Sequence, residues 1–516
     1  MTGASASAMS TRRAWAGTAV LSASLLVITM DMTILNIALP TMSQELRPSG
    51  EQLLWIVDVY SLVLAGLLVA ASGVADRWGR KRMLLIGYTV FAAASLLVLI
   101  ADSPAAVIAI RAALGVGGAM VMPTTLSLIR TIFTDHKQRA MALAVWSAVA
   151  GLGAAVGPLV GGLLLEHLSW HAAFLVNVPL MVVAVIAGAV LLPESRSDEP
   201  GAWDWPTVGL SFGGMVALMW SIKKFGKESS LLVPTPWIVL VIAVAALTVF
   251  VRRSLRQDDP MLDVGLFRNR PFTGGIAAAL GSMFAMAAAL LLLAQWLQSV
   301  EGSSPIRTGV QLIPLALAAA VASLVAPKAA EILGPRTVLA VSIAISGLGM
   351  AAIYLTPGEL HYRAVAVSLC LVGAGIGSLA VGSVLIMSGS PEHRAGNAAA
   401  MEETSYEVGS VLGVAILGSI ASVMYRADLD SSAEFARLPD AISVPARESI
   451  GAAVDVADAA GVPDLAHTAG HAFTTSMQAT SLVGGVVMLA VAALVWFVVP
   501  KGTTLEPAKA VAPVSG

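Results

Sequence analysis

Ionisable residues interrupt several long apolar stretches of this sequence. Two aspartates lie in the first two stretches, an arginine lies in the fourth and three glutamates lie together near residue 400; they are Asp31, Asp58, Arg111, Glu402, Glu403 and Glu407. An ionisable side chain inside a membrane-spanning helix is costly unless it is paired or faces a water-filled cavity, so it is a functional candidate by default. We expect Arg111 either to pair with an acid or to line a proton path.

The spacing of the acids predicts their arrangement. Asp31 and Asp58 lie about seven and about six residues from the outer ends of successive antiparallel helices, which places both carboxylates roughly 10 Å deep. They could face one cavity, or each could snorkel or cap a helix. Glu403 and Glu407 share a helix face, whereas Glu402 lies about 100° away. We expect Glu407 to lie deepest, and Glu402 either to bind protons or to pair with an inner basic group.

The composition indicates a membrane protein. The chain has 516 residues, of which 57% are hydrophobic and 12% are charged, whereas a soluble domain has about 25% charged residues. Most of this apolar surface must face lipid, where helices satisfy the backbone internally. The sequence predicts an all-α integral membrane protein with about fourteen transmembrane helices, near 15–38, 52–72, 83–101, 105–128, 140–163, 172–192, 205–222, 236–252, 272–298, 308–327, 335–356, 362–387, 396–425 and 472–499.

Lysine and arginine positions predict the orientation of these helices. Most of the 30 basic residues fall in segments that are inside when both termini are cytoplasmic; Lys223, Lys224 and Lys227 form an exception in one outer loop. The segment 427–471 is then an acidic outer loop, which we expect to be solvated, with a short helix at 445–461. The net charge of −2 argues against nucleic acid as a partner.

A charged loop between the second and third helices has a weaker copy between the tenth and eleventh. The first reads Asp-Arg-Trp-Gly-Arg at 76–80, and the copy reads Glu-Ile-Leu-Gly-Pro-Arg at 331–336. A carboxylate, a glycine turn and an arginine can brace neighbouring helix ends. Such a repeat places a binding cavity between two halves of the protein. The candidates for conformational control in this loop are Asp76, Arg77, Gly79 and Arg80.

The repeat divides the chain into six, two and six helices. The predicted parts are a cytoplasmic tail at 1–14, a six-helix bundle at 15–192, two additional helices with linkers at 193–271, a second six-helix bundle at 272–499 that includes the loop 427–471, and a cytoplasmic tail at 500–516.

Small residues recur in the fifth helix, where glycines permit close helix packing and a proline removes one backbone hydrogen bond. Ordinary tight packing is the alternative explanation for this pattern. The residues concerned are Gly153, Gly157, Pro158, Gly161 and Gly162.

Several segments together resemble the major facilitator superfamily. The loop at 76–82 resembles its signature, the segment 111–117 resembles its fourth-helix motif, and the fifth-helix glycines resemble a motif of its antiporters. The chain also resembles the superfamily's fourteen-helix drug:proton antiporters, and among these the QacA-type exporters of quaternary ammonium compounds. The segments that carry this resemblance are 31–40, 54–62, 123–127, 170–179 and 396–403.

The resemblance implies a proton-coupled antiporter that exports lipophilic organic cations, such as quaternary ammonium compounds and cationic dyes, by alternating access. The ionisable residues named above would exchange protons for substrate, and the fifth-helix residues would serve the conformational change. We expect no cofactor and no metal. The expected partners are the substrate, protons and the bilayer of a bacterial cytoplasmic membrane. The expected functional unit is a monomer. Aromatic side chains bind flat cations, and the candidates are Trp55, Tyr60, Trp146, Phe284, Trp296 and Tyr406.

Other classes stay open as alternatives. A major facilitator exporter or importer of a specific endogenous metabolite would share the fold and its buried carboxylates, although the antiporter-like fifth helix argues against import. A channel would carry a ring of like residues or a pore loop, and the sequence shows neither. An enzyme is not expected, because no nucleophile triad, metal-ligand cluster or Walker loop is present.

Overall fold

The computed structural model describes residues 9–48, 50–197, 203–228, 233–257, 260, 262–356, 359–391, 394–432 and 435–505. Every regular element in these ranges is a helix, which confirms the predicted all-α membrane fold. Thirteen helices of the described ranges are long and apolar enough to cross a membrane. Parts of the two predicted tails, 1–8 and 506–516, lie outside the described residues.

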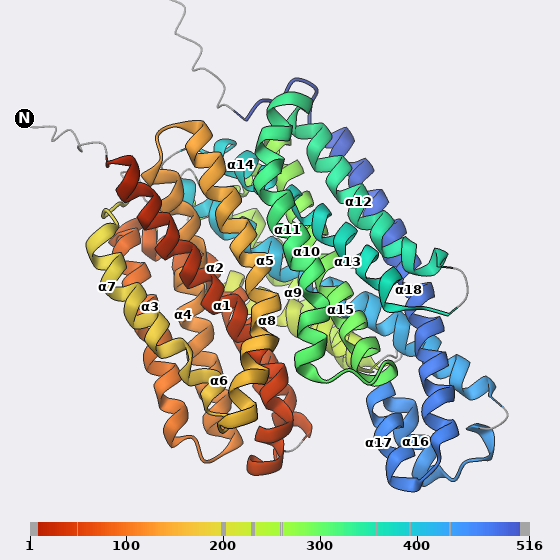
Figure 1. Cartoon of the computed structure of the whole chain (residues 1–516). Coiled ribbons are helices and arrows are strands. Elements are labelled where there is room, and N and C mark those ends of the chain that lie inside the picture. Colours follow the sequence, from red (N-terminus) through yellow and green to blue (C-terminus); the bar gives the residue numbers. More distant parts are fainter. Residues whose placement is uncertain are drawn as a thin grey trace, which may run out of the picture.

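The first lobe contains the helices that precede residue 192 (Figure 1). They are α1 (Thr11–Leu46), α2 (Gly50–Trp78), α3 (Arg80–Leu96) with η1 (Leu97–Ile100), α4 (Pro104–Ile132), α5 (His136–His167), α6 (Ala172–Leu175) and α7 (Asn177–Leu191). Within this lobe α1 packs against α5, and α2 packs against α4. The helix α5 is not among the thirteen candidate spans, but its 32 residues are enough to cross a bilayer at about 1.5 Å per residue.

The second lobe contains the helices that follow residue 270. They are α10 (Arg270–Gln295) with η3 (Trp296–Val300), α11 (Pro305–Leu333), α12 (Pro335–Leu355), α13 (Tyr362–Ile376), α14 (Ser378–Ser388), α15 (Ala395–Ser431) and α18 (Pro463–Val498). The short helices α13 and α14 form one continuous span. The two lobes meet where α5 packs against α11, and where α15 packs against α2 and α4.

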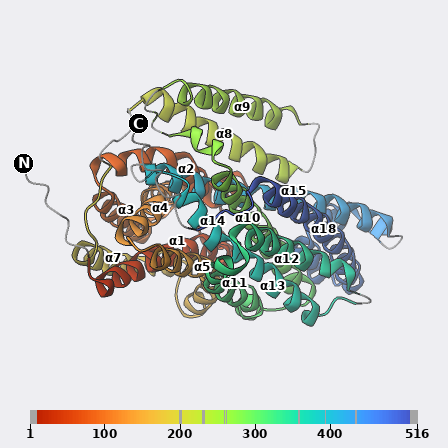
Figure 2. The same ribbon diagram turned by 90° about the horizontal axis from the view of Figure 1, so that it is seen from above.

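Two further helices, α8 (Trp205–Glu228) and α9 (Pro234–Ser254), lie beside the lobes (Figure 2). The helix α8 contacts α2 of the first lobe and α15 of the second. One apolar cluster joins the three helices through Leu62, Ala65, Met215, Met219 and Val411. Because α8 continues to Glu228, Lys223 lies within a helix rather than in the predicted loop.

The described chain begins and ends at one face of the molecule, which we call the terminal face (Figure 1). The opposite face, the loop face, carries η5 (Phe435–Arg437), α16 (Asp440–Glu448) and α17 (Ile450–Ala460). Phe435, Ala446 and Ile450 are buried there, and the Tyr425 hydroxyl of α15 donates to the Ala446 carbonyl at 2.9 Å. The expectation of a solvated loop is therefore wrong: this segment is a packed helical cap whose buried residues join the main core, and α17 lies within the short helix predicted at 445–461.

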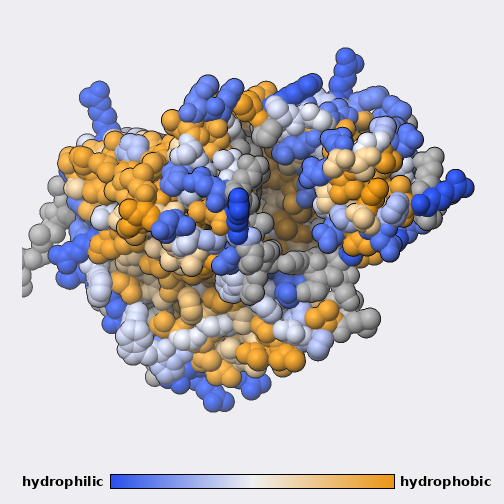
Figure 3. Space-filling view, turned by 90° about the horizontal axis from the view of Figure 1, so that it is seen from below, coloured by the Kyte–Doolittle hydropathy of each residue, from blue (hydrophilic) through white to orange (hydrophobic). Residues whose placement is uncertain are grey.

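The loop face is hollowed between two raised parts of the surface, and apolar side chains lie in the depth of the recess (Figure 3). At the terminal face, by contrast, polar side chains of one lobe contact the other, as described below. The loop face therefore carries a recess, whereas polar contacts between the lobes close the terminal face.

Candidate functional site

Asp31 lies in the middle of α1 with only 1% of its surface exposed. Both carboxylate oxygens accept hydrogen bonds: Arg111 of α4 donates from Nη1 to Oδ2 at 2.8 Å, and Asn177 of α7 donates from Nδ2 to Oδ1 at 2.7 Å. Arg111 also donates from Nε to the Ile56 carbonyl at 3.2 Å, and it lies 4.5 Å from the ring centroid of Tyr60. A buried ion pair, Asp31–Arg111, thus ties together four helices of the first lobe.

Asp58 of α2 has a different partner. Its carboxylate accepts a hydrogen bond from the Lys223 ammonium of α8, and the two side chains are 28% and 25% exposed. Asp31 and Asp58 are therefore each paired with a separate base, whereas a shared cavity was one of the arrangements that the sequence left open.

Three glutamates of α15 lie where the lobes meet. Glu402 and Glu403 are fully buried, and Glu407 is 6% exposed. Oε1 of Glu402 accepts hydrogen bonds from the hydroxyls of Ser383, on α14, and of Tyr406, the latter at 2.5 Å. Within the described ranges Glu402 has no basic partner, so the alternative of an ion pair at the inner end is wrong for this residue.

Part of this acidic cluster lacks hydrogen-bond donors. In the part of the chain that the structure describes, neither oxygen of Glu403 nor Oε2 of Glu402 has a hydrogen-bond partner. Glu407 lies one turn beyond Glu403, within electrostatic range of Lys223. A buried carboxylate without donors is strongly disfavoured as a bare anion. The cluster is therefore suited to holding protons or a cation.

Two of the six aromatic candidates border this cluster. Trp146 of α5 stacks on Tyr406 of α15, with the ring centroids 6.5 Å apart and an interplanar angle of 28°. The Trp146 Nε1 donates to Oγ1 of Thr125 at 3.1 Å, which fixes the indole between the lobes. This stacked aromatic pair from opposite lobes lies beside Glu402 and is buried, so its π faces could meet a flat cation only when the lobes move apart.

The other aromatic candidates have different surroundings. Tyr60 lies under Arg111, Trp55 is 38% exposed near the start of α2, and the Phe284 backbone lies against α15. Trp296 is buried in the second lobe, where its Nε1 donates to Thr474 of α18 at 3.1 Å. The structure thus brings together Trp146 and Tyr406 but places Trp296 in a packing position.

The glycines of α5 face different neighbours. A Cβ on Gly157 would lie 1.9 Å from Oγ1 of Thr33, and Gly153 makes an equally close approach to α1 one turn earlier. This packing lies within the first lobe. A Cβ on Gly162 would instead lie 2.6 Å from Cγ1 of Ile306 on α11, so this glycine permits a contact between the lobes. Gly161 is buried, and the side chain of Pro158 lies outside the described residues.

The charged loop between α2 and α3 braces the terminal face. Arg80 donates from Nη2 and Nε to Oδ1 of Asp76 at 2.9 and 3.1 Å, and from Nη1 to Thr131 of α4 at 3.2 Å. Gly79 has a φ of +113°, a conformation that a side chain rarely adopts. The Arg77 guanidinium lies 5.8 Å from the ring centroid of Trp203.

The same loop reaches the second lobe. A Cβ on Gly396, in the first turn of α15, would lie 2.3 Å from Oδ2 of Asp76. The amino end of a helix carries a partial positive charge, so the Asp76 carboxylate stabilises this contact electrostatically. The predicted brace therefore joins the lobes as well as two neighbouring helix ends.

A second contact closes the terminal face. Arg130, at the end of α4, donates from Nη1 to Oγ and from Nη2 to the carbonyl of Ser390, both at 2.6 Å. Ser390 lies between α14 and α15. On the second lobe Asn269 donates to the Gly389 carbonyl at 2.9 Å, which holds the same turn in place.

The arrangement of two lobes around buried carboxylates agrees with the comparison to known proteins. The sequence profile of the Major Facilitator Superfamily matches residues 21–414. The chain belongs to this superfamily. It is 39% identical to the multidrug efflux pump LfrA of Mycolicibacterium smegmatis, over 94% of this chain and 96% of that protein. It is 33% identical to the methyl viologen resistance protein SmvA of Salmonella typhimurium, over 95% of this chain and 99% of that protein.

Solved structures support the same fold. The human organic anion transporter MFSD10 covers 94% of this chain, and 99% of its own chain, with a TM-score of 0.62 at 13% identity. A bacterial homolog of the lysosomal transporter Spinster covers 95% of this chain, and 98% of its own, with a TM-score of 0.56 at 16% identity. This superfamily member is therefore a multi-pass membrane transporter and not an enzyme.

Sequence reasoning missed four polar residues of these networks. Asn177 lies in a segment that resembles a family marker, and that segment was the available signal. Ser383 and Ser390 are serines among many, and only tertiary contacts distinguish them. Lys223 was assigned to a loop because the apolar run stops before it, although the helix does not.

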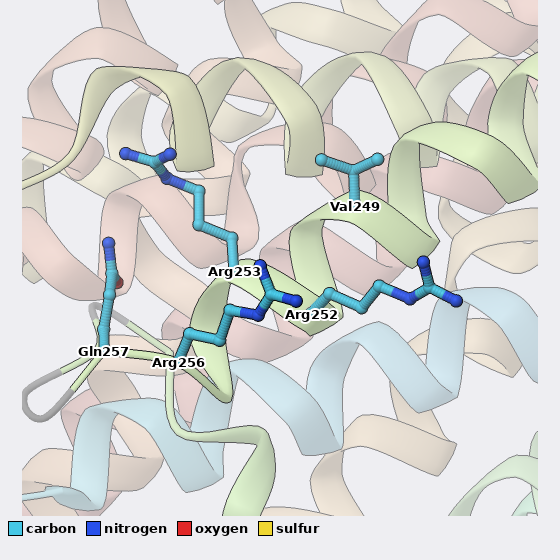
Figure 4. Close-up of a pocket in the computed structure, with 5 residues that line it drawn as sticks. All are labelled: Val249, Arg252, Arg253, Arg256 and Gln257. Atoms are coloured by element: carbon cyan, nitrogen blue, oxygen red, sulfur yellow. The ribbon is translucent and has the colours of Figure 1, made fainter.

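A basic pocket of about 510 Å³ lies apart from the carboxylates, at the end of α9 (Figure 4). Arg252, Arg253 and Arg256 line it together with Gln257. Arg253 and Gln257 both donate to Asp204, just before α8, so this side of the pocket ties α9 to α8. The Arg253 guanidinium holds the pKa of the Asp204 carboxyl well below its usual range.

Proposed function

We propose that this superfamily member is a proton-coupled multidrug efflux antiporter that exports lipophilic organic cations, such as quaternary ammonium compounds and cationic dyes. The observation that carries the proposal is the glutamate cluster of α15, in which three carboxylate oxygens lack donors within the described ranges. Such a cluster can be neutralised by protons or by a bound organic cation, and the two compete for the same carboxylates. Exchange of protons for substrate requires this competition.

The surroundings of the cluster favour aromatic or lipophilic cations. The stacked pair of Trp146 and Tyr406 offers π faces beside Glu402, and cation–π attraction strengthens when water is excluded. One relative named as a multidrug efflux pump and another named as a methyl viologen resistance protein support this substrate class.

The proposed cycle assigns the terminal face to the cytoplasm. Basic residues gather there, including Arg77, Arg80, Arg82 and Arg130, as expected for a cytoplasmic side. In this proposal the recess of the loop face is the outward exit, and the lobes move further apart before a cation leaves and protons reach the glutamates, which are buried in this structure. Opening of the terminal face would then release the protons and admit the next cation from the cytoplasm or the inner leaflet.

In this proposal the chain works as a monomer in a bacterial cytoplasmic membrane. The bundles at 15–192 and 272–499 rock against each other, and the two helices within 193–271 are additional to them. The Asp31–Arg111 pair supports the first lobe, while Glu402, Glu403 and Glu407 exchange protons for substrate.

Transport in proteoliposomes of the purified protein tests the proposal. We expect release of preloaded ethidium to accelerate when the opposite compartment is acidified, and to return to the leak rate when a protonophore abolishes the gradient. Glu403→Gln is expected to remove the dependence on the gradient. Ethidium movement that is indifferent to the gradient, or exchange of only a neutral metabolite, would contradict the proposal.

A further inference from the structure

The two additional helices contribute a charged group to the junction of the lobes. Lys223 belongs to α8, which is part of neither lobe, yet its ammonium donates to the Asp58 carboxylate of α2. The two side chains are 25% and 28% exposed, so neither is fully withdrawn from water. An ion pair at such a site is stabilising but reversible.

The position of α8 brings the same ammonium near the second lobe. The apolar cluster of Leu62, Met215, Met219 and Val411 seats α8 in the groove between α2 and α15. Lys223 is consequently also within electrostatic range of Glu407 on α15. One positive charge thus lies between a carboxylate of the first lobe and a carboxylate of the second.

We propose that Lys223 is a tethered cation that occupies the place of the substrate's positive charge between Asp58 and Glu407, and that a monovalent organic cation binds by displacing it. This inference rests on the proposed exchange of cations at the α15 glutamates. It assigns the additional helices a direct part in substrate binding.

The chemistry of lysine suits this role. An ammonium on a flexible four-carbon stem can leave a carboxylate and return to it without moving the helix. While the site holds no substrate, Lys223 offsets the repulsion between Asp58 and Glu407 across the two lobes. When a cation arrives, the ammonium withdraws toward the water that already reaches its partly exposed side chain.

Binding of tetraphenylphosphonium to the purified full-length protein, at one fixed pH, tests the inference. Removing a competing cation should tighten binding, so we expect Lys223→Gln to lower the Kd by about fivefold, the equivalent of an exposed ion pair of about 1 kcal/mol. Lys223→Arg keeps the charge and should bind like the wild type. Lys224→Gln removes the next positive charge along α8 and is the matched control, for which no change is expected.

A double-mutant cycle identifies the partner. In the Asp58→Asn background the ammonium has lost its main acceptor, so Lys223→Gln should change the Kd by less than twofold. Thermal stability of every variant is measured in parallel, and only folded variants are compared. Weaker or unchanged binding in a folded Lys223→Gln variant would overturn the inference and leave Lys223 as a structural tether. Absence of tetraphenylphosphonium binding to the wild type would instead overturn the proposed function.

Discussion

The Asp31 carboxylate uses both of its oxygens, one for Arg111 and one for Asn177. A buried carboxylate whose two oxygens both accept hydrogen bonds is held in one geometry. Asp31 therefore differs from Glu403, whose oxygens have no donors in the described part of the chain. Under the proposed function, Asp31 supports the first lobe and Glu403 exchanges protons for substrate.

This difference leads to a prediction for Asp31→Asn. The variant leaves a buried guanidinium without its counter-charge, which should lower stability by about 3–5 kcal/mol. The double variant Asp31→Asn/Arg111→Gln removes both charges and should recover most of that loss. Thermal unfolding in detergent measures the stability, and ethidium efflux normalised to the folded protein measures the transport.

The transport result decides the role of the pair. If Asp31 acts through structure alone, the double variant should regain at least a third of wild-type efflux. A stable double variant with no efflux would instead place Asp31 among the exchanging carboxylates, as its position in the sequence first suggested.

Substitution of Glu402 should change proton binding with little effect on folding, so it separates the two effects more clearly than substitution of Asp31 does. In Glu402→Gln the amide oxygen can still accept from Ser383 and Tyr406, so stability should stay within about 1 kcal/mol of wild type. Proton release on substrate binding, followed with a pH-sensitive dye, should fall by at least half. Tyr406→Phe keeps the carboxylate and removes one donor, so its proton release should persist. Equal proton release from Glu402→Gln and the wild type would exclude Glu402 from coupling.

At the scale of elements, the helices were predictable and their polar pairings were not. Apolar length marks a membrane helix locally, so the spans and the loop at 76–82 could be found from the sequence. The partners of Asp31 are 80 and 146 residues away, and no local pattern encodes which distant residue meets it. The sequence leaves the role of Glu402 open for the same reason, because its burial depends on α14.

The cap at the loop face shows a second limit. Its helices α16 and α17 are short and carry acidic residues, so hydropathy alone suggested a solvated loop. They are held by burial of a few apolar residues, such as Phe435 and Ile450, against the ends of longer helices. A few buried apolar residues in an acidic segment give no distinct signal in composition.

The helix α5 leads to a prediction that separates packing within a lobe from packing between lobes. Gly157→Leu meets the α1 backbone and Thr33, so it should disturb Asp31 and lower thermal stability. Gly162→Leu meets the flexible end of Ile306 on α11, so it should lower the exchange rate several-fold with a smaller loss of stability. Unfolding midpoints and tetraphenylphosphonium exchange on the same preparations measure both effects. The opposite ranking of stabilities would mean that α5 packs more tightly between the lobes than within the first.

At the scale of the whole molecule, the two faces differ in what joins the lobes. The terminal face is closed by a few polar contacts, chiefly Asp76 against Gly396 and Arg130 on Ser390. The loop face carries the recess of Figure 3, and the lobes also meet toward this face where Gly162 of α5 approaches Ile306 of α11. A carrier can alternate only if the free energies of its two states differ little, so a small number of hydrogen bonds is enough to set the balance.

Arg130 is therefore expected to control which face is open. Its two hydrogen bonds to Ser390 involve a charged donor, and such bonds contribute about 1.5–3 kcal/mol each. Arg130→Ala should therefore shift a substantial fraction of molecules toward opening at the terminal face.

Spin labels measure this shift in a background with Cys370→Ala. Labels at Arg82→Cys and Lys328→Cys report the distance between the lobes at the terminal face, and labels at Asp102→Cys and Glu301→Cys report it at the loop face. We expect the first distance to gain a longer component and the second a shorter one. Arg12→Ala, which removes an exposed charge from the same face, is the control and should change neither. Unchanged distances in Arg130→Ala would mean that the Asp76 contact alone holds the terminal face closed, and a combined variant with Asp76→Asn would then be required to open it.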